Sequence, residues 1–232
     1  MRRIGIIAAM AGELKPLVQG WKAMPARHGE SIWQGTVDGD SCIAVCAGMG
    51  KEAAARACAI AAQDVPLTAL VSVGWAGALS CGLQAGSAYV INEVVDDATG
   101  ERFAAKSPPR AGNAGALRLV TIDHVALSPE KRRLGEGYQA VLVDMEAAAV
   151  ARVARGQGIP FYCLKAVSDA AGETLPDFSR YTDDQGHLQL AALLAHVAIR
   201  PRYWPGLARM GKNGRRGAVA MAAAIGPLMG GA

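Results

Sequence analysis

The sequence has few aromatic residues and few charges, and it has no long hydrophobic run. Aromatic residues make up 5% of its 232 residues and charged residues 19%, whereas 51% are hydrophobic. An apolar fraction this large excludes intrinsic disorder as the main state, and the length is sufficient to bury a substantial core. Because alanine and glycine supply much of the bulk, we expect close packing of helices on a sheet.

The cysteines lack every pattern that would indicate a metal site or a disulfide framework. There are five, with no Cys-x-x-Cys pair and no Cys/His grouping at zinc spacing. An odd number within apolar stretches indicates buried free thiols, which suit a reducing cytoplasm. The four histidines are scattered, and none is assigned a role. We predict no metal and no cofactor.

The apolar runs of the sequence also do not indicate a membrane-spanning helix or a secretory signal peptide. No run reaches the ~18 uninterrupted apolar residues that a spanning helix requires. The N-terminal segment starts with two arginines and a short apolar run that Glu13 interrupts, so we interpret it as a strand and not as a signal peptide. These observations predict a cytoplasmic protein.

Acidic residues are missing from the end of the chain. No Asp or Glu follows Asp184, although the last 48 residues hold six of the 24 basic residues, and residues 1–184 hold 18 basic and all 20 acidic residues. The formal charge of +4 therefore arises from the C-terminal region. We predict a main domain at 1–199 and a basic C-terminal helical tail at 200–232.

Short apolar runs alternate with helical patterns along the main domain. We predict strands at 3–9, 31–37, 41–47, 67–74, 87–95, 117–124, 139–143 and 161–167. We predict helices that begin near 12 and 128, and others at 51–63, 145–157, 186–199 and 203–224. Residues 74–78 are expected to form a turn and 98–116 a loop. Such alternation predicts a three-layer α/β domain around a mixed, mostly parallel sheet flanked by helices.

Three acidic residues stand where a strand meets a turn or a helix. Glu13 follows the first strand, Glu146 follows the strand that ends at 143, and Asp169 follows the strand that ends at 167. Ligands of open α/β sheets bind at the carboxyl ends of strands, so these carboxylates are candidate site residues. Each could instead complement the N-terminal dipole of a helix.

Four motifs in order give the carboxylates a family context. IGIIAAMAGE at 4–13 resembles the opening of methylthioadenosine/S-adenosylhomocysteine nucleosidases. GWAGAL at 74–79, VDMEA at 143–147 and KAVSD at 165–169 resemble the G-S-A-G-x-L, V-E-M-E-A and R-A-I-S-D motifs of the purine nucleoside phosphorylase superfamily. The resemblance covers most of residues 1–170. It implies the nucleoside phosphorylase fold, with 1–199 as its catalytic domain, and a homodimer.

The resemblance also implies roles for individual residues. Cleavage of an N-glycosidic bond to adenine needs a proton on the leaving base, which Asp169 would give to purine N7. Glu146 would accept hydrogen bonds from the ribose hydroxyls above Met145, and Glu13 would activate or orient a water molecule. The base would be bordered by the residues around two strand ends, which are Ala76, Gly77, Val167 and Ser168.

Two positions depart from the family motifs. Trp75 stands where serine is usual, which removes a hydroxyl near the nucleophile and adds an apolar wall; it is alternatively a core residue with one partner for its N–H. Lys165 replaces an arginine, which keeps the charge but loses the bidentate fork. We include both as substrate-binding candidates.

Other segments resemble the hopanoid-associated phosphorylase branch. These are the short loop around GERF at 100–103, the run at 119–123 and the tail at 200–209. The branch implies adenosylhopane as substrate, with release of adenine. A lipid-linked substrate suits an enzyme at the inner face of the membrane, held by Arg209, Lys212 and Arg216 on one helical face. The alternative is a helix that packs on the domain, next to a solvated tail.

Two further functions and the choice of nucleophile stay open. The chain is alternatively a general methylthioadenosine/S-adenosylhomocysteine nucleosidase, or a non-catalytic nucleoside-binding protein at a membrane. Phosphate remains a candidate co-substrate, with Lys51, Arg56 and Lys165 as the cations nearest to the predicted site. Glu13 would repel a phosphate dianion and therefore favours water. The tail has no aromatic interleaving, so nucleic acid is not expected as a partner.

Overall fold

The computed structural model describes residues 2–26, 29–108, 116–171 and 204–230. Within these residues one mixed sheet runs through the molecule. Its strands are β1 (Arg3–Ala8), β2 (Lys22–Met24), β3 (Ser31–Val37), β4 (Asp40–Cys46), β5 (Ala69–Ala78), β6 (Ala88–Ile91), β7 (Glu93–Asp96), β8 (Arg102–Ala104), β9 (Arg118–Thr121), β10 (Leu142–Asp144) and β11 (Phe161–Asp169). The helices are α1 (Ala11–Leu14), α2 (Lys51–Ala62), α3 (Ser128–Tyr138), α4 (Ala147–Gly156) and α6 (Trp204–Gly230).

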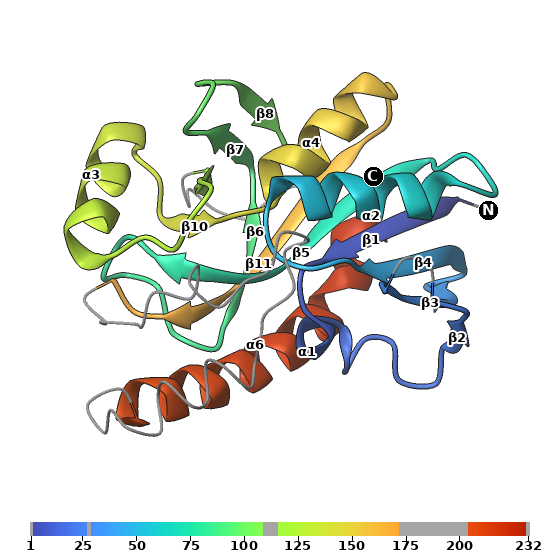
Figure 1. The fold of residues 1–232 in the computed structure, drawn as a ribbon, viewed down its shortest axis with the longest axis horizontal. Helices are drawn as coiled ribbons and strands as arrows, with labels where there is room; N and C mark the ends of the chain where they lie inside the picture. The colour runs from blue at the N-terminus through green and yellow to red at the C-terminus, as the bar shows by residue number, and fades with distance from the viewer. Residues whose placement is uncertain (1, 27–28, 109–115, 172–203, 231–232) are drawn as a thin grey trace.

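The strand order is β2-β3-β4-β1-β5-β10-β9-β7-β8, and β11 pairs with β5 and β6 beside this path. The central pairs β4–β1, β1–β5, β5–β11, β10–β9 and β9–β7 are parallel, whereas the outer pairs and β5–β10 are antiparallel. Figure 1 shows α2 and α4 above the sheet and α1 and α6 below it. The predicted three-layer fold with a mixed, mostly parallel sheet is confirmed.

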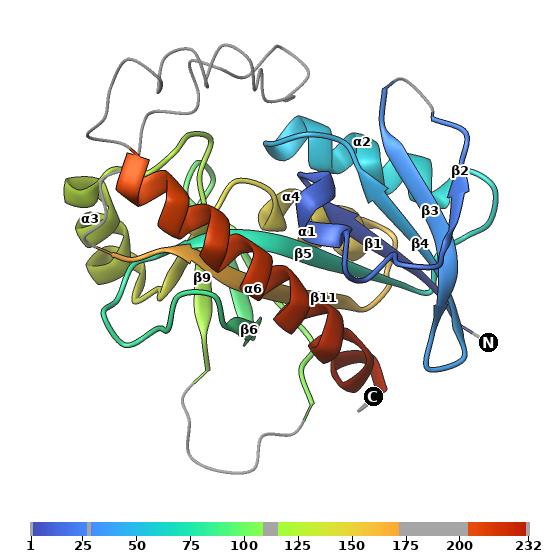
Figure 2. The same ribbon diagram turned by 90° about the horizontal axis from the view of Figure 1, so that it is seen from below.

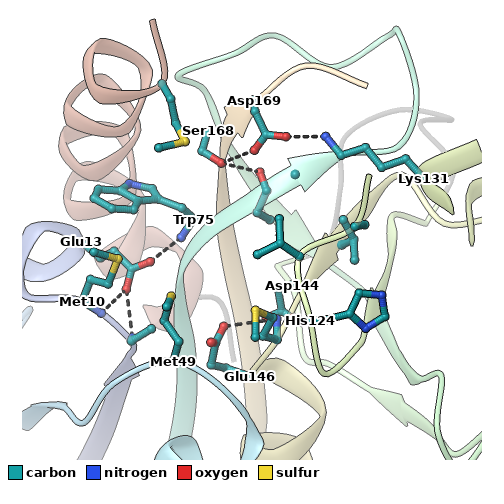
Figure 3. Close-up of a pocket in the computed structure, with 18 residues that line it drawn as sticks. Met10, Glu13, Met49, Trp75, His124, Lys131, Asp144, Glu146, Ser168 and Asp169 are labelled. Carbon is teal, nitrogen blue, oxygen red and sulfur yellow. Dashed lines mark hydrogen bonds and ion pairs between the residues drawn. The ribbon is translucent and has the colours of Figure 1, made fainter. Parts of the chain in front are cut away.

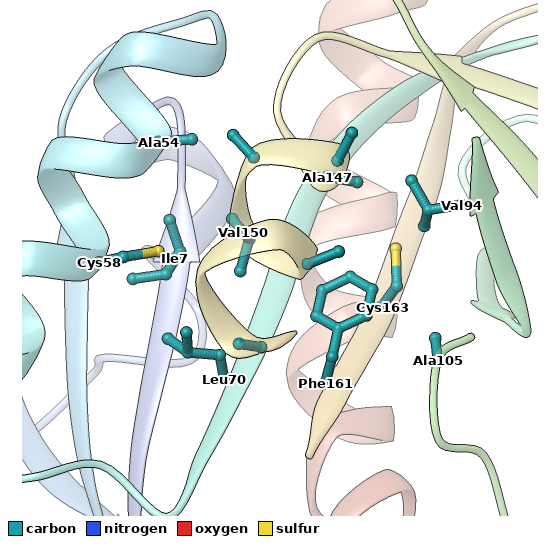
Figure 4. Packing of buried hydrophobic residues seen from close by; sticks show 14 of the residues in the cluster. Ile7, Ala54, Cys58, Leu70, Val94, Ala105, Ala147, Val150, Phe161 and Cys163 are labelled. Atoms are coloured by element: carbon teal, nitrogen blue, oxygen red, sulfur yellow. The ribbon is translucent and has the colours of Figure 1, made fainter. Parts of the chain in front are cut away.

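The face under α2 and α4 is packed with small side chains, as the composition predicts. Ala54 and Cys58 of α2 and Ala147 and Val150 of α4 lie over the sheet, where Phe161 fills the space beside them (Figure 4). Alanine at these positions lets the helix axes come close to the strands while still removing apolar surface from water. Burial raises the pKa of the Cys58 thiol to about 12, and all five cysteines are free.

The other face is covered by α6, which runs across β5 and β11 (Figure 2). Its apolar residues Met221, Ile225 and Leu228 are buried in one cluster with residues of β1, β4, β5 and β11. Gly217 permits this contact, because a Cβ there would stand 2.6 Å from Cβ of Ala166. Gly217 is thus a packing position, and the helix extends beyond the predicted end at 224 through Pro227 to Gly230.

Several element boundaries differ from the predictions. The turn expected at 74–78 is wrong, because β5 continues to Ala78 by pairing first with β11 and then with β10. The loop expected at 98–116 contains the short strand β8, which pairs with β7. The predicted strand at 87–95 is split at Asn92, whose side-chain oxygen accepts a hydrogen bond from the N–H of Leu117. The helix predicted at 186–199 and the domain boundary at 199 lie outside the described residues.

No helix among the described residues is both long enough and apolar enough to cross a membrane.

Candidate active site

A cavity of about 190 Å³ opens where β1, β5, β10 and β11 end. Its wall contains Glu13, Glu146 and Asp169, so the structure brings the three predicted carboxylates to one place. Figure 3 shows Asp169 at one end of the cavity, with Glu13 and Glu146 toward the other. This is the location that open α/β sheets use for ligands, and it follows from the parallel arrangement of the central strands.

Glu13 lies at the base of the cavity, and three backbone N–H groups hold its carboxylate. Oε2 accepts from Ala9 at 3.0 Å and from Met10 at 2.9 Å, and Oε1 accepts from Trp75 at 2.8 Å. Burial raises the pKa of Glu13, and the three hydrogen bonds together with the charge of Lys165 oppose that rise. The group is therefore fixed in orientation and retains one lone pair for a further donor.

The position of Glu13 depends on a glycine in β5. Gly74 has a φ of +152°, and a Cβ on it would stand 2.9 Å from Oε1 of Glu13. Any larger residue would push the carboxylate away from the N–H of Trp75. The glycine-rich motif that begins at Gly74 is thus mostly part of β5, and Gly74 leaves space for the carboxylate of Glu13.

Trp75 forms a wall of the cavity and a contact to α6. Its indole N–H donates to the carbonyl of Gly214 at 3.1 Å. A Cβ at Gly12 or at Gly214 would stand 3.1 Å from the indole ring, so the ring is held between α1 and α6 by two residues without side chains. The indole therefore has the single N–H partner expected of a packed tryptophan, and it also lines the site.

Lys165 lies behind the cavity wall and pairs with Asp144. Its side chain is 1% exposed, and its Nζ is 2.8 Å from Oδ2 of Asp144. Burial alone would lower the pKa of Lys165, but the charges of Asp144 and Glu146 outweigh burial and raise it. Asp144 also accepts from the hydroxyl of Thr121 at 2.7 Å and from the N–H of Ala147 at 3.0 Å.

This ion pair joins two departures from the family motifs. Asp144 stands where the V-E-M-E-A motif has its first glutamate, and Lys165 stands where R-A-I-S-D has arginine. Asp144 is shorter than the glutamate of the motif and Lys165 is smaller than its arginine, and the two side chains remain in hydrogen-bonding contact. Sequence reasoning named Lys165 as a substrate-binding candidate, but its ammonium is turned to Asp144 and it does not line the cavity.

Glu146 stands at the N-terminus of α4 and reaches the N-terminus of α2. Its Oε1 accepts from the N–H of Gly50 at 2.8 Å, and its Oε2 accepts from the N–H of Met145 at 3.3 Å. Burial, together with the negative charge of Asp144, raises the pKa of Glu146 to about 7, although Lys165 acts in the opposite direction. The carboxyl group is thus poised to change its charge near neutral pH.

Asp169 ends β11 with its carboxylate held from two sides. The hydroxyl of Ser168 donates to Oδ1 at 2.6 Å, and the ammonium of Lys131 from α3 donates to Oδ2. Both members of the ion pair are almost fully buried. Ser168 was among the predicted residues, whereas Lys131 was not. A lysine among the charged residues of a helix such as SPEKRR gives no sequence signal that it faces inward.

The remaining predicted residues divide into those that line the cavity and one that does not. Met145, Ala76 and Gly77 lie in the wall. Val167 is fully buried in the core, and its backbone groups pair with residues 86 and 87, so the structure does not bring it to the cavity. The wall also contains residues that sequence reasoning passed over, which include Met10, Met49, His124 and Met210.

His124, which was not assigned a role from the sequence, lies at the rim of the cavity. Its Nδ1 is 2.6 Å from Asp123 and its Nε2 is 2.8 Å from Glu130, and these hydrogen bonds raise the pKa of the imidazole. Carboxylates contact both ring nitrogens, so neither nitrogen is free to act as a base.

Comparison with known proteins gives consistent relatives. A family model described as the phosphorylase superfamily matches residues 3–124 and 119–200. The 5'-methylthioadenosine/S-adenosylhomocysteine nucleosidase of Actinobacillus succinogenes is 25% identical over 229 residues, which cover 84% of this chain and 99% of the relative. The nucleosidase of the same description from Shewanella denitrificans is 26% identical, covering 84% of this chain and 100% of the relative.

Solved structures agree with these relatives. The S-adenosylhomocysteine nucleosidase of Streptococcus pyogenes, in complex with 5-methylthiotubericidin, superposes with a TM-score of 0.65 at 26% identity, over 74% of this chain and 85% of that chain. A Helicobacter pylori protein with 5'-methylthioadenosine in its active site has a TM-score of 0.71 at 16% identity, over 98% and 100%, and shares the fold. The relatives at 25% identity and above are nucleosidases, which confirms the predicted enzyme class.

Proposed function

The chain belongs to the phosphorylase superfamily, and from this premise we propose that it hydrolyses the N-glycosidic bond of an adenine nucleoside. One observation supports this proposal above the others. A single cavity holds a carboxylate for the base at one end and two carboxylates for the sugar and the nucleophile toward the other. Glycosidic cleavage needs these three functions around an oxocarbenium-like transition state.

At the base end, Asp169 would protonate the leaving purine at N7. Its Oδ1 is fixed by the hydroxyl of Ser168, so the carboxylate plane cannot rotate freely. Gly77 lies beside it, and a Cβ there would stand 3.3 Å from Oδ2. The absence of that side chain keeps one face of the carboxylate accessible to a planar base. A proton on the base lowers the barrier because the leaving group then departs without negative charge.

At the sugar end, Glu146 would accept hydrogen bonds from the ribose hydroxyls above Met145. Each carboxylate oxygen already accepts one backbone N–H and has a lone pair left for a hydroxyl. With a pKa of about 7, the group accepts these bonds as an anion mainly at neutral and alkaline pH. We expect ribose binding to strengthen as the pH rises through 7.

Water is the nucleophile that the charges favour. Each cation considered for phosphate already has a carboxylate partner: Lys51 with Asp96 at 2.7 Å, Arg56 with Glu30 at 3.7 Å, and Lys165 with Asp144 at 2.8 Å. A phosphate dianion would meet Glu13 without an available clamp among the described residues. Glu13 would instead accept a hydrogen bond from water and orient it toward the sugar.

The apolar wall of the cavity supports the substrate class that we propose. Met10, Met49, Met145 and Met210 line the cavity together with Trp75. Flexible thioethers and an indole suit an apolar substituent on the sugar, and they do not provide partners for a charged one. We propose adenosylhopane as the substrate, in line with the motifs of the tail. Methylthioadenosine and S-adenosylhomocysteine are the alternative, because the relatives named above act on such nucleosides.

Adenine release from three substrates tests these proposals. Purified protein is incubated with adenosylhopane in micelles, with methylthioadenosine and with S-adenosylhomocysteine, each with and without phosphate. We expect phosphate-independent adenine release, with the highest kcat/KM on adenosylhopane. Faster cleavage of the two soluble nucleosides would favour the alternative substrates. Adenine release that requires phosphate would overturn the hydrolytic proposal.

A variant pair separates catalysis from binding. Asp169→Asn keeps the size of the side chain but cannot supply the proton, so we expect at least a ~100-fold loss of kcat. Asp64→Asn, at an exposed position far from the cavity, serves as the matched control. Nucleoside binding without adenine release by the unaltered protein would support the non-catalytic alternative and reject the enzymatic one.

Peripheral membrane contact remains a proposal for α6. Lys212, Arg215 and Arg216 are exposed on this helix, and Trp204 and Val219 are its exposed large apolar residues. Because Met221, Ile225, Leu228 and Met229 are buried, these large apolar side chains are not available to a bilayer. We expect binding to vesicles with anionic lipid to fall when Lys212 and Arg216 are both changed to Glu. Unchanged binding would reject the contact.

The homodimer and the cytoplasmic location stay predictions.

A further inference from the structure

The buried lysine of α3 has no role in the scheme above. Lys131 and Leu134 are the buried residues of α3, whereas its neighbours Arg132 and Arg133 are exposed. The Lys131 side chain is 3% exposed and lines the cavity. Transfer of an ammonium group from water into such a position costs several kcal/mol unless a charged partner compensates it. The partner is Asp169, the residue that is to protonate the base.

The contacts fix the ammonium at one oxygen of Asp169. Lys131 Nζ donates to Oδ2 of Asp169 and to the carbonyl of Ala170 at 3.2 Å. Ser168 occupies the other oxygen. Figure 3 shows Lys131 reaching Asp169 from the side opposite to Trp75. The Lys131 ammonium is therefore a proton donor in direct hydrogen-bonding contact with the carboxyl group that is to protonate the base.

We propose that Lys131 is the positioning residue that supplies Asp169 with the proton destined for the leaving base. This inference rests on the proposed adenine-releasing function. An N–H bond of the Lys131 ammonium breaks as an O–H bond forms at Oδ2 of Asp169. That O–H bond breaks as purine N7 is protonated, and the electrons of the C1'–N9 bond move to the base. Water bonds to C1' and loses a proton to solvent, from which the Lys131 amine regains its own.

Other titratable groups face the same cavity and must be considered with the pair. They are Glu13 from α1, His124 at the rim, Asp144 of β10 and Glu146 before α4, and behind the wall Glu130 pairs with His124 and Lys165 pairs with Asp144. These groups are common to the unaltered protein and to every Lys131 variant. A difference between their pH profiles therefore reports on the pair formed by Lys131 and Asp169.

Two variants distinguish proton supply from the mere placement of a charge. Lys131→Arg keeps a cation beside Asp169, but a guanidinium does not release its proton in proteins. Lys131→Met removes the cation, so that Asp169 must take its proton from solvent. We expect Lys131→Arg to lose at least ~100-fold in kcat between pH 6 and 9. We expect Lys131→Met to lose as much at pH 9 and to regain activity as the pH falls, because an isolated carboxylic acid holds its proton only at lower pH.

The experiment measures kcat and KM for adenine release from pH 5 to 9, with Lys15→Met on the exposed surface of the molecule as the control. Binding of adenine and the thermal midpoint are measured for each variant, so that a folding defect is seen directly. Lys131→Arg that keeps the unaltered kcat and pH profile would overturn the inference. If the unaltered protein releases adenine from none of the nucleosides, the proposed function is overturned instead.

Discussion

Replacement of Glu146 by glutamine should make the protein more stable at neutral pH while it damages the site. The Glu146 carboxyl group is buried beside Asp144, and its pKa is raised from an ordinary value of 4.5 to about 7. A raised carboxyl pKa means that the folded state binds the proton more tightly than the unfolded chain does. The ionised group therefore lowers the stability of the fold, and this cost grows as the pH rises from 4.5 through 7.

The magnitude follows from the two pKa values. Each unit of pKa difference corresponds to about 1.4 kcal/mol, so the raised pKa of Glu146 lowers the stability of the fold by about 1 kcal/mol at pH 5, about 2 kcal/mol at pH 6 and about 3 kcal/mol above pH 7. Glutamine is uncharged like the protonated acid, and its oxygen can accept from the N–H of Gly50, but its NH2 cannot accept from the N–H of Met145. The lost bond to Met145 does not depend on pH, so the stability of Glu146→Gln relative to the unaltered protein should rise by about 3 kcal/mol between pH 4.5 and pH 8.

Urea unfolding followed by tryptophan fluorescence, at half-unit steps from pH 5 to 8.5, measures this difference. Glu52→Gln on the exposed face of α2 is the matched control and should give no pH-dependent gain. A difference between Glu146→Gln and the unaltered protein that does not change with pH would refute the reasoning, since it would show that the carboxylate ionises in the fold as easily as in water. In activity assays the same variant should lose the rise of kcat/KM through pH 7.

Three further outcomes are expected. Lys165→Met should cost about 3–5 kcal/mol in urea unfolding at pH 7 because it leaves Asp144 buried and unpaired, and adding Asp144→Asn should restore most of this loss; no recovery in the double variant would contradict the pairing. Trp75→Phe should lose about 1–3 kcal/mol, with the hydrogen bond to Gly214, and an unchanged thermal midpoint would count against that contact. Met221→Ala should cost about 2–5 kcal/mol because its side chain is 3% exposed in the core, whereas a loss below 1 kcal/mol would show that α6 is a dispensable tail.

The fold could be predicted from the sequence where periodicity and end signals coincide. The strand at 31–37 and the helix at 51–62 were placed almost to the residue, because each has a clear hydrophobic pattern and a glycine or turn residue at its ends. The continuation of β5 through 74–78 could not be predicted, since two glycines within five residues usually indicate a turn. Pairing with β10 and β11 supplies the hydrogen bonds that keep this segment extended.

The candidate site divides in the same way. Glu13, Glu146 and Asp169 could be predicted because acidic residues that follow predicted strands can be recognised in the sequence, and the family motifs supported them. Lys131 could not, because its partner lies 38 positions away and a lysine on a charged helix is normally solvated. The packing of α6 on the sheet was one of two alternatives that the sequence left open, because the contacts of Gly214 with Trp75 and of Gly217 with Ala166 join residues far apart in the chain.

The excess of negative charge at the sugar end connects the stability cost with the chemistry. Three carboxylates (Glu13, Asp144 and Glu146) lie within electrostatic reach of one ammonium, that of Lys165. Burial, together with this surplus, raises the pKa of Glu146 in the resting protein, and the surplus repels a phosphate dianion. As the glycosidic bond breaks, positive charge develops on the ribose between these groups, and preorganised anions stabilise such charge without further rearrangement. The pair of Lys131 and Asp169 is neutral by comparison, which suits the end of the cavity where a base must leave without gaining charge. The same uncompensated charge that weakens the fold at neutral pH is thus the feature that would accelerate departure of the base.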